Sequence, residues 1–302
     1  MKTGSVRLKV VGAHAFLAGT LMLRPGALKA ADLPVLYQTL AETGQSGLAA
    51  PAEIPFKLYR DYAIVVRGSV GDCDKLNLFI DTGASSTVVD LALARKLRLP
   101  VSPRTIQVFS NAVASGDVVL PSLQLGPVRV VPMAAVVQDL SGLSDSLLVR
   151  VDVIVGIDVL ARSSFALDYK TKKLILGPVG TLANSVQCDA RAPYPTVPLE
   201  VGGRVLRVYV DTGAQELALF ESPSAPIPHK RDGEGRTGIG GQVVVEPAEF
   251  QALRLGATHW AKRKGLVMQA PYKLFDGLLG PKWLGASRIA FDVEHRIVSW
   301  DN

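Results

Sequence analysis

The sequence is poor in the residues that build metal sites and the common nucleophilic sites. Its 302 residues include only four histidines. They are scattered, at His14, His229, His259 and His295. None belongs to an H-E-x-x-H motif or a similar ligand spacing, and no G-x-S-x-G motif occurs, which argues against a zinc hydrolase and a serine hydrolase. We therefore expect neither a metal nor a cofactor.

Cysteine is also scarce, with one residue at Cys73 and one at Cys188. They do not form a C-x-x-C pair. In an oxidising compartment they could form a disulfide, and two unpaired thiols fit the sequence equally well. The sequence leaves both alternatives open.

Long apolar runs are missing beyond the N-terminus, so we expect no membrane-spanning core. Residues 1–30 combine a basic start, an apolar stretch from Val10 to Leu23 and small residues near Ala30. This pattern predicts a signal peptide and export to the periplasm or the exterior. The alternatives are an uncleaved anchor and a disordered tail.

The basic excess does not predict nucleic-acid binding. The formal charge is +6, and the first 30 residues carry basic side chains but no acidic one. Those basic residues are Lys2, Arg7, Lys9, Arg24 and Lys29. The remainder of the chain is close to neutral and lacks the basic footprint of a nucleic-acid partner.

The feature that organises the chain is an internal repeat. Residues 78–86 read Leu-Phe-Ile-Asp-Thr-Gly-Ala-Ser-Ser, and residues 208–215 read Val-Tyr-Val-Asp-Thr-Gly-Ala-Gln. Each is an apolar, β-prone run that leads into an Asp-Thr-Gly-Ala turn. Each is followed by an apolar pair and a glycine, Ile154-Val155-Gly156 and Leu278-Leu279-Gly280. Features repeated in the same order indicate two related halves.

We therefore predict two lobes, at residues 55–176 and 196–302, with a linker at 177–195 and a leader at 31–54. Short apolar runs separated by glycine and proline, with few helical periods, are typical of all-β proteins. The predicted fold is all-β, with two related β-barrel-like lobes and the active site between them.

With these motifs, the chain resembles a two-lobed aspartic protease of the pepsin and retroviral protease superfamily. The resemblance covers roughly residues 55–302. It implies that Asp81 and Asp211 are catalytic. It also implies supporting roles for the residues that follow each aspartate, namely Thr82, Gly83, Thr212 and Gly213. The threonines would exchange hydrogen bonds between the lobes, and the glycines would allow tight turns whose N–H groups face the carboxylates.

The same resemblance directs attention to hairpins that would cover a cleft. In the first lobe we interpret residues 111–116 as a small polar loop, with Asn111, Ser115 and Gly116 as candidate flap residues. In the second lobe the candidates are Gly238, Gly240 and Gly241, in a glycine-rich hairpin tip. No tyrosine lies between Arg104 and Val130, where pepsin-like enzymes carry one.

The predicted function is hydrolysis of peptide bonds by a water activated between two carboxyl groups. The substrate would be an extended peptide or protein, and one chain carrying both aspartates would act as a monomer. One alternative is a peptide-binding module that keeps the fold without turnover. Another is a narrow processing protease that acts on one envelope partner.

Overall fold

The computed structural model describes residues 50–108, 111–221, 234–238, 241–269 and 274–302. The predicted signal peptide, residues 31–49 of the predicted leader, and Gly240 lie outside these ranges. Strands account for 55% of the structure and helices for 10%, so the all-β prediction is confirmed. Among the described residues no helix is both long and apolar enough to cross a membrane.

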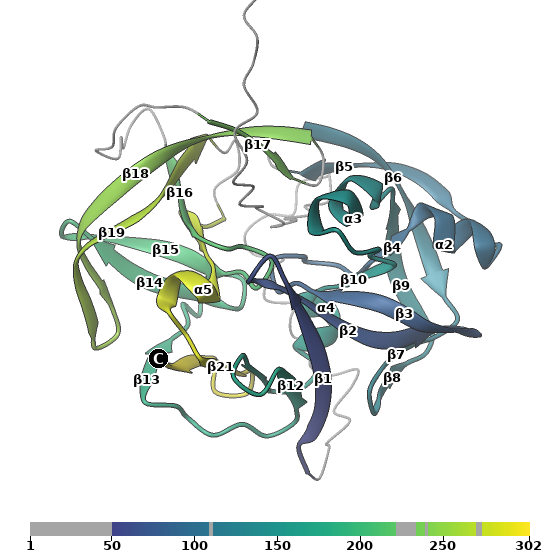
Figure 1. Ribbon diagram of the computed structural model, residues 1–302, viewed down its shortest axis with the longest axis horizontal. Coiled ribbons are helices and arrows are strands. Elements are labelled where there is room, and N and C mark those ends of the chain that lie inside the picture. Colours follow the sequence, from purple (N-terminus) through teal and green to yellow (C-terminus); the bar gives the residue numbers. More distant parts are fainter. Residues whose placement is uncertain (1–49, 109–110, 222–233, 239–240, 270–273) are drawn as a thin grey trace, which may run out of the picture.

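The first half of the described chain builds one set of strands with short helices (Figure 1). Its elements are β1 (Ala52–Tyr59), β2 (Ala63–Val70), β3 (Cys73–Ile80), β4 (Val88–Asp90), α2 (Leu91–Lys96), β5 (Ser102–Val108), β6 (Asn111–Leu120), β7 (Leu123–Leu125), β8 (Val128–Val130), β9 (Met133–Gln138), α3 (Ser141–Leu147), β10 (Val153–Val155) and α4 (Ile157–Leu160). Three strands follow: β11 (Phe165–Asp168), β12 (Lys173–Leu176) and β13 (Asn184–Gln187).

The second half contains fewer and longer strands. The strands are β14 (Thr196–Val201), β15 (Arg204–Val210), β16 (Leu217–Glu221), β17 (Glu234–Gly238), β18 (Gly241–Leu255), β19 (Thr258–Gln269), β20 (Gly277–Leu279), β21 (Arg288–Asp292) and β22 (Ile297–Asp301), and the short helix α5 (Pro281–Leu284) lies between β20 and β21. Six of them, in the order β14-β15-β20-β16-β19-β18, form a barrel that is closed by pairing between β14 and β18.

The repeat seen in the sequence is also a repeat of strand pairing. In the first half β10 runs parallel to β3 and antiparallel to β4. In the second half β20 runs parallel to β15 and antiparallel to β16. The apolar pair that precedes each glycine therefore lies in a strand inserted beside the strand that carries the aspartate. All residues of β10 and β20 are buried, as expected for strands with neighbours on both sides.

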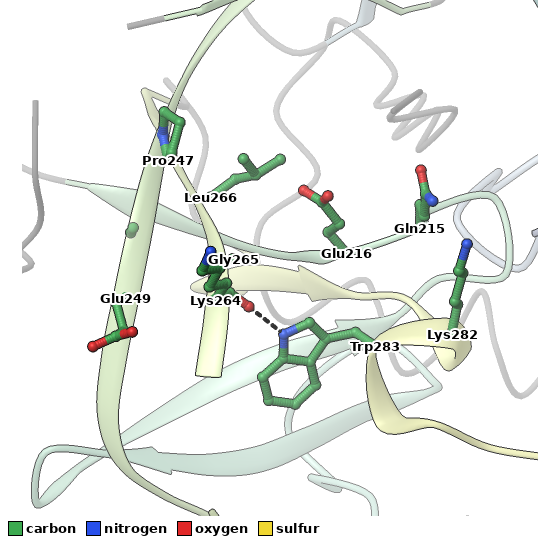
Figure 2. A pocket seen from close by; sticks show the side chains of 10 residues that line it. Gln215, Glu216, Pro247, Glu249, Lys264, Gly265, Leu266, Lys282 and Trp283 are labelled. Carbon is green, nitrogen blue, oxygen red and sulfur yellow. Dashed lines mark hydrogen bonds between the residues drawn. The ribbon is translucent and has the colours of Figure 1, made fainter. Parts of the chain in front are cut away.

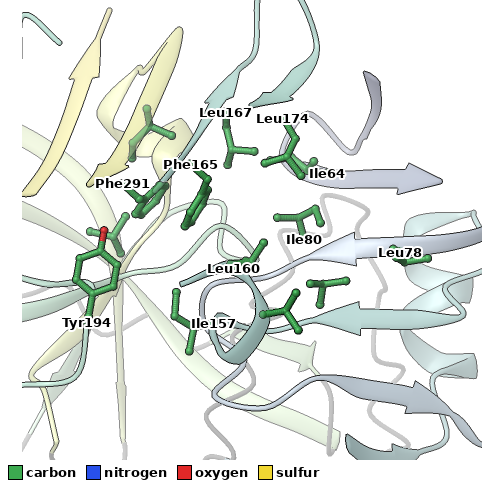
Figure 3. Packing of buried hydrophobic residues seen from close by; sticks show 14 of the residues in the cluster. Ile64, Leu78, Ile80, Ile157, Leu160, Phe165, Leu167, Leu174, Tyr194 and Phe291 are labelled. Carbon is green, nitrogen blue, oxygen red and sulfur yellow. The ribbon is translucent and has the colours of Figure 1, made fainter. Parts of the chain in front are cut away.

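The closing hairpins of the two halves join in one sheet. Strand β11 pairs with β12 on one side and with β21 on the other. In this register Phe165 lies opposite Phe291, and their rings stack with centroids 4.5 Å apart. Figure 3 shows these rings beside Ile157 and Leu160 of α4. The two halves thus share a hydrophobic core.

Two predictions about the first half need correction. Residues 111–116 do not form a loop, because Asn111, Ser115 and Gly116 all lie in strand β6. Small and polar residues misled the interpretation, although β6 pairs with β5 on one side and, from Gly116 onward, with β9 on the other. The first lobe also begins earlier than predicted, since β1 starts at Ala52. Both cysteines, which the sequence left undecided, are free thiols.

Candidate active site

The two Asp-Thr-Gly-Ala turns begin where strands β3 and β15 end. The Asp81 N–H donates to the carbonyl of Val155 at 3.1 Å, and the Asp211 N–H donates to the carbonyl of Leu279 at 3.0 Å. Each inserted strand therefore holds one aspartate by its backbone. The pleated strand stops at this point, and the chain turns toward the other half of the molecule.

The structure brings Asp81 and Asp211 together. A Cβ atom on Gly83 would lie 2.6 Å from the Asp211 Oδ1 atom, and one on Gly213 would lie 2.6 Å from the Asp81 Oδ1 atom. Only glycine allows this approach, because carbon and oxygen atoms do not come so close without bonding. Each glycine N–H also donates to the Oδ1 atom of its own aspartate, at 2.9 Å for Gly83 and 2.8 Å for Gly213.

Thr82 and Thr212 cross-link the two turns. The Thr82 hydroxyl donates to the carbonyl of Val210 at 2.8 Å and accepts from the Thr212 N–H at 3.0 Å. Symmetrically, the Thr212 hydroxyl donates to the carbonyl of Ile80 at 3.0 Å and accepts from the Thr82 N–H at 2.9 Å. All four bonds are buried. They fix the turns relative to each other and thereby fix the separation of the two carboxyl groups.

Burial and mutual charge shift the titration of this pair, which we call the dyad. Neither aspartate has exposed surface. Burial raises the pKa of Asp81 well above the ordinary 3.8, and the charge of Asp211 and a hydrogen bond with its carboxyl raise it further. Burial also raises the pKa of Asp211, against the opposing effect of hydrogen bonds from Asp81 and Gly213. Two carboxyls that cannot both ionise cheaply hold one proton between them.

Two tyrosines near the turns were missed by the sequence analysis. The Tyr209 hydroxyl hydrogen-bonds the carbonyls of Thr82, at 2.8 Å, and of Tyr194, at 2.9 Å. Tyr209 stands where the first repeat has Phe79, so a comparison of the two motifs contained this signal. Tyr62 precedes β2 and is buried close to the dyad. It is too far from Asp81 along the chain for the residues around either one to indicate that the two lie close together.

Asp158, a partly buried aspartate, braces the first turn. The Asp158 carboxylate accepts the Thr87 N–H at 2.9 Å and the Thr87 hydroxyl at 2.8 Å. Burial raises the pKa of Asp158 to about 6 although both of these hydrogen bonds lower it. The matching position of the second half, two residues after Gly280, is Lys282, whose ammonium lies 3.6 Å from the Asp61 carboxylate of the β1–β2 loop. The two halves therefore carry opposite charges at this position.

This pKa gives a stability prediction for Asp158→Asn. The carboxyl binds its proton more tightly in the folded chain than in the unfolded chain, so its stabilising contribution is complete below pH 3.8 and is lost as pH rises through about 6. Because Asp158 is partly exposed, we discount the linkage value and expect the variant to gain about 1–2 kcal/mol relative to the parent between pH 4 and pH 7.

Denaturant unfolding of parent and variant at both pH values measures this gain. The dyad titrates in both proteins, so its own pH dependence cancels in the comparison. A stability difference that stays constant from pH 4 to pH 7 would contradict the prediction.

The candidate flap residues occupy two hairpins. Ser115 is anchored in β6, where its hydroxyl donates to the Val137 carbonyl at 2.8 Å, and Gly116 pairs with Val137. They therefore belong to the base of the β5–β6 hairpin, whereas Asn111 pairs with Val108 next to the tip. In the second half Gly238 pairs with Gly241 at the end of the β17–β18 hairpin.

A cavity of about 500 Å³ lies beside the second turn (Figure 2). Gln215 and Glu216, which directly follow the turn, form one side of it, and Lys282 and Trp283 of α5 form another. The Trp283 indole N–H donates to the Lys264 carbonyl at 2.6 Å, which ties α5 to strand β19. The first half has Ser85 where the second has Gln215, so the two turns have different surroundings.

Within the described part of the chain, no group of three or more histidine, cysteine, aspartate or glutamate residues could hold a metal ion. The polar centre of the site is thus the pair of carboxyl groups. The all-β fold with two facing Asp-Thr-Gly turns is consistent with an all-β protease fold.

Comparison with known proteins agrees with this reading of the fold. Residues 66–159 match the family described as aspartyl protease. The matched segment contains Asp81 and its turn, strand β10 and most of α4, which together form the first half of the site. It is less than half of the chain and does not reach Asp211. A search of curated proteins found no match.

Proposed function

We propose that this protein is an aspartic endopeptidase that hydrolyses peptide bonds with a water activated between Asp81 and Asp211. The observation that carries the proposal is the contact between the two buried turns, in which each glycine lies against the opposite carboxyl group. Such a pair supplies a base and an acid from one shared proton. The family match over the first half supports the same reaction class.

In the proposed mechanism the ionised carboxyl takes a proton from water as the water oxygen bonds to the scissile carbonyl carbon. The protonated carboxyl donates a hydrogen bond and then its proton to the carbonyl oxygen, which gives a neutral tetrahedral diol. The ionised carboxyl takes one hydroxyl proton from the diol, and the protonated carboxyl gives its proton to the leaving nitrogen as the C–N bond breaks. The dyad regains its single proton, and no covalent enzyme intermediate forms.

The substrate in this proposal is an extended peptide. Strands β5 and β17 each lie at the end of a sheet order, so their outer backbone groups can pair with an added strand. Both aspartates belong to one chain, and a monomer would therefore hold a complete dyad. Export to the periplasm or the exterior remains a proposal that rests on the pattern of residues 1–30.

The test is cleavage of a diverse peptide pool by the full chain from pH 3 to pH 8. At least one carboxyl must be ionised, so activity falls as pH drops below the first dyad pKa. Because burial raises both values, this acidic limb is expected clearly above pH 3.8. A peptide analogue with a non-hydrolysable tetrahedral centre should block cleavage with one molecule per chain.

Three outcomes would redirect the proposal. Binding of the analogue without hydrolysis of any peptide would favour a peptide-binding module with this fold. Cleavage of one coexported protein, with the pool untouched, would favour a narrow processing protease. Neither binding nor cleavage at any pH would overturn the proposed function.

A further inference from the structure

Tyr62 carries a buried hydroxyl group that the mechanism above does not use. It lies between β1 and β2, where its N–H donates to the Tyr59 carbonyl at 3.1 Å. Strand β2 pairs with β3 so that Val65 lies opposite Phe79. If this antiparallel register is continued by two residues along each strand, Ala63, the first residue of β2, lies beside Asp81. The topology therefore places Tyr62 next to the first turn although 19 positions separate it from Asp81 along the chain.

The Tyr62 side chain is 2% exposed, and its hydroxyl has no hydrogen-bond partner among the described residues. The Oδ2 atoms of Asp81 and Asp211 are also buried and without a partner in that set. Burial raises the pKa of Tyr62, and the charges of Asp81 and then Asp211 raise it further, while Arg60 lowers it. The Tyr62 hydroxyl therefore lies close enough to both carboxyl groups for their charges to affect its titration.

The loop that carries Tyr62 is anchored from two sides. The Arg60 guanidinium Nε donates to the Ser146 carbonyl at 3.0 Å, and the Asp61 carboxylate pairs with Lys282 of α5 at 3.6 Å. The first contact joins the loop to the end of α3, and the second joins it to the half that carries Asp211. These contacts connect the loop that carries Tyr62 to both halves of the molecule.

The four residues of each Asp-Thr-Gly-Ala turn bring no spare side-chain donor to the dyad. Ala84 and Ala214 have apolar side chains, and the hydroxyls of Thr82 and Thr212 are engaged with backbone carbonyls. Buried polar atoms in folded proteins are almost always hydrogen-bonded, either to protein or to ordered water. A single water that hydrogen-bonds the Tyr62 hydroxyl and the Oδ2 atoms of Asp81 and Asp211 is the simplest way to give all three oxygens a partner.

We propose that Tyr62 is a positioning residue of the dyad, whose hydroxyl donates a hydrogen bond through one water to the Oδ2 edge of the Asp81 and Asp211 pair. A donor at this edge stabilises the singly ionised pair relative to the doubly protonated pair. It also orients the water that the dyad activates. The consequence for turnover rests on the proposed function, whereas the effect on dyad titration does not.

Tyr62→Phe tests the proposal because it removes only the hydroxyl. The dyad is titrated by the carboxyl ¹³C signals of Asp81 and Asp211, a measurement that requires no turnover. We expect the lower dyad pKa to rise by at least about 0.5, because a donor to the ionised form is lost. The acidic limb of the kcat/KM profile should move up by the same amount, and kcat/KM should fall about 3- to 10-fold.

Tyr194→Phe is the matched control. The Tyr194 hydroxyl is also buried and without a partner among the described residues, but the charges that act on it are those of Cys188, Asp292 and Arg296, not those of the dyad. This variant should leave the carboxyl titration unchanged. A comparison of the two variants separates loss of the specific donor from loss of any buried hydroxyl.

A second measurement needs no variant. In the parent, the ring Cζ signal of Tyr62 should follow the first ionisation of the dyad, because its hydroxyl responds to charge on the carboxyls. A flat Tyr62 signal, or a Tyr62→Phe titration identical to that of the parent, would overturn the proposal. A shifted titration in a chain that cleaves no peptide would uphold the role of Tyr62 and refute the proposed function.

Discussion

Replacing either dyad aspartate with asparagine is expected to lower kcat/KM for peptide cleavage at least about 1,000-fold. An amide can neither take a proton from water nor give one to the scissile carbonyl. Because one proton serves both carboxyls, the remaining aspartate cannot perform both roles. Asp81→Asn and Asp211→Asn should therefore have similar effects, and the double variant should be scarcely worse than either single variant.

The same substitutions should leave the fold intact. Asp81 and Asp211 are fully buried, and burial raises the pKa of each, so a neutral side chain of the same shape relieves an electrostatic cost at neutral pH. Thermal unfolding at pH 7 should show variants at least as stable as the parent. This outcome distinguishes loss of chemistry from loss of structure.

Asp152→Asn is the matched control for the dyad variants. Asp152 is also a buried aspartate, but its carboxylate accepts from the Asn77 N–H at 2.9 Å and pairs with Arg150 at 2.6 Å. It immediately precedes β10, and its hydrogen-bond and ion-pair partners are Asn77, Arg150 and Asp90, none of which belongs to either turn, so this variant should retain activity. If Asp81→Asn or Asp211→Asn retained more than about a tenth of the parental kcat/KM, the shared-proton mechanism would be wrong.

Removing the hydroxyl of Thr82 or Thr212 is expected to cost about 2–4 kcal/mol of unfolding free energy. Valine preserves the shape of threonine but leaves a backbone carbonyl and a backbone N–H of the opposite turn buried without partners. In Thr82→Val these groups belong to Val210 and Thr212. Leaving a buried polar group without a partner costs more free energy than an average hydrogen bond contributes. We therefore expect a loss of stability at the upper end of the range for replacing a hydroxyl with a methyl group.

The two substitutions should not be additive. Once Thr82→Val has loosened the contact between the turns, Thr212→Val has less left to remove. The double variant is therefore expected to cost at least about 1 kcal/mol less than the sum of the single variants. Denaturant unfolding of the four proteins in the cycle measures this coupling.

Thr196→Val provides the control, since Thr196 is equally buried but its hydroxyl donates to the carbonyl of Pro193 within the same segment. Its loss should show no coupling to Thr82→Val. Additive costs for Thr82→Val and Thr212→Val would mean that the two turns do not act as a unit.

Several features could be predicted from the sequence because they are local. The apolar runs before Asp81 and Asp211, the glycine two residues after each, and the turn residues that follow are encoded in adjacent positions. Their repetition, with Gly156 and Gly280 in corresponding places, indicated two related halves and an all-β fold. A repeated motif constrains which segments must meet, so the pair of aspartates was identified as the candidate site.

The flap candidates show where local information failed. The run from Asn111 to Gly116 is small and polar, which is typical of loops, but pairing with β5 and β9 makes it a strand. Strand pairing between distant segments outweighs the weak preferences of single residues. For the same reason the sequence could not show that β11 and β21 would join the closing hairpins of both halves in one sheet.

The sequence by itself determined the all-β character of the chain, the two Asp-Thr-Gly turns and the chemistry available to them, because each depends on residues close together along the chain. Tertiary structure alone decided the contact between Gly83 and the Asp211 carboxyl, the burial that raises the pKa of both aspartates, and the position of Tyr62 beside them. These features depend on distances between segments far apart in the chain, and a pKa responds to all charges and dipoles around the group. They come into existence only when the two halves pack together.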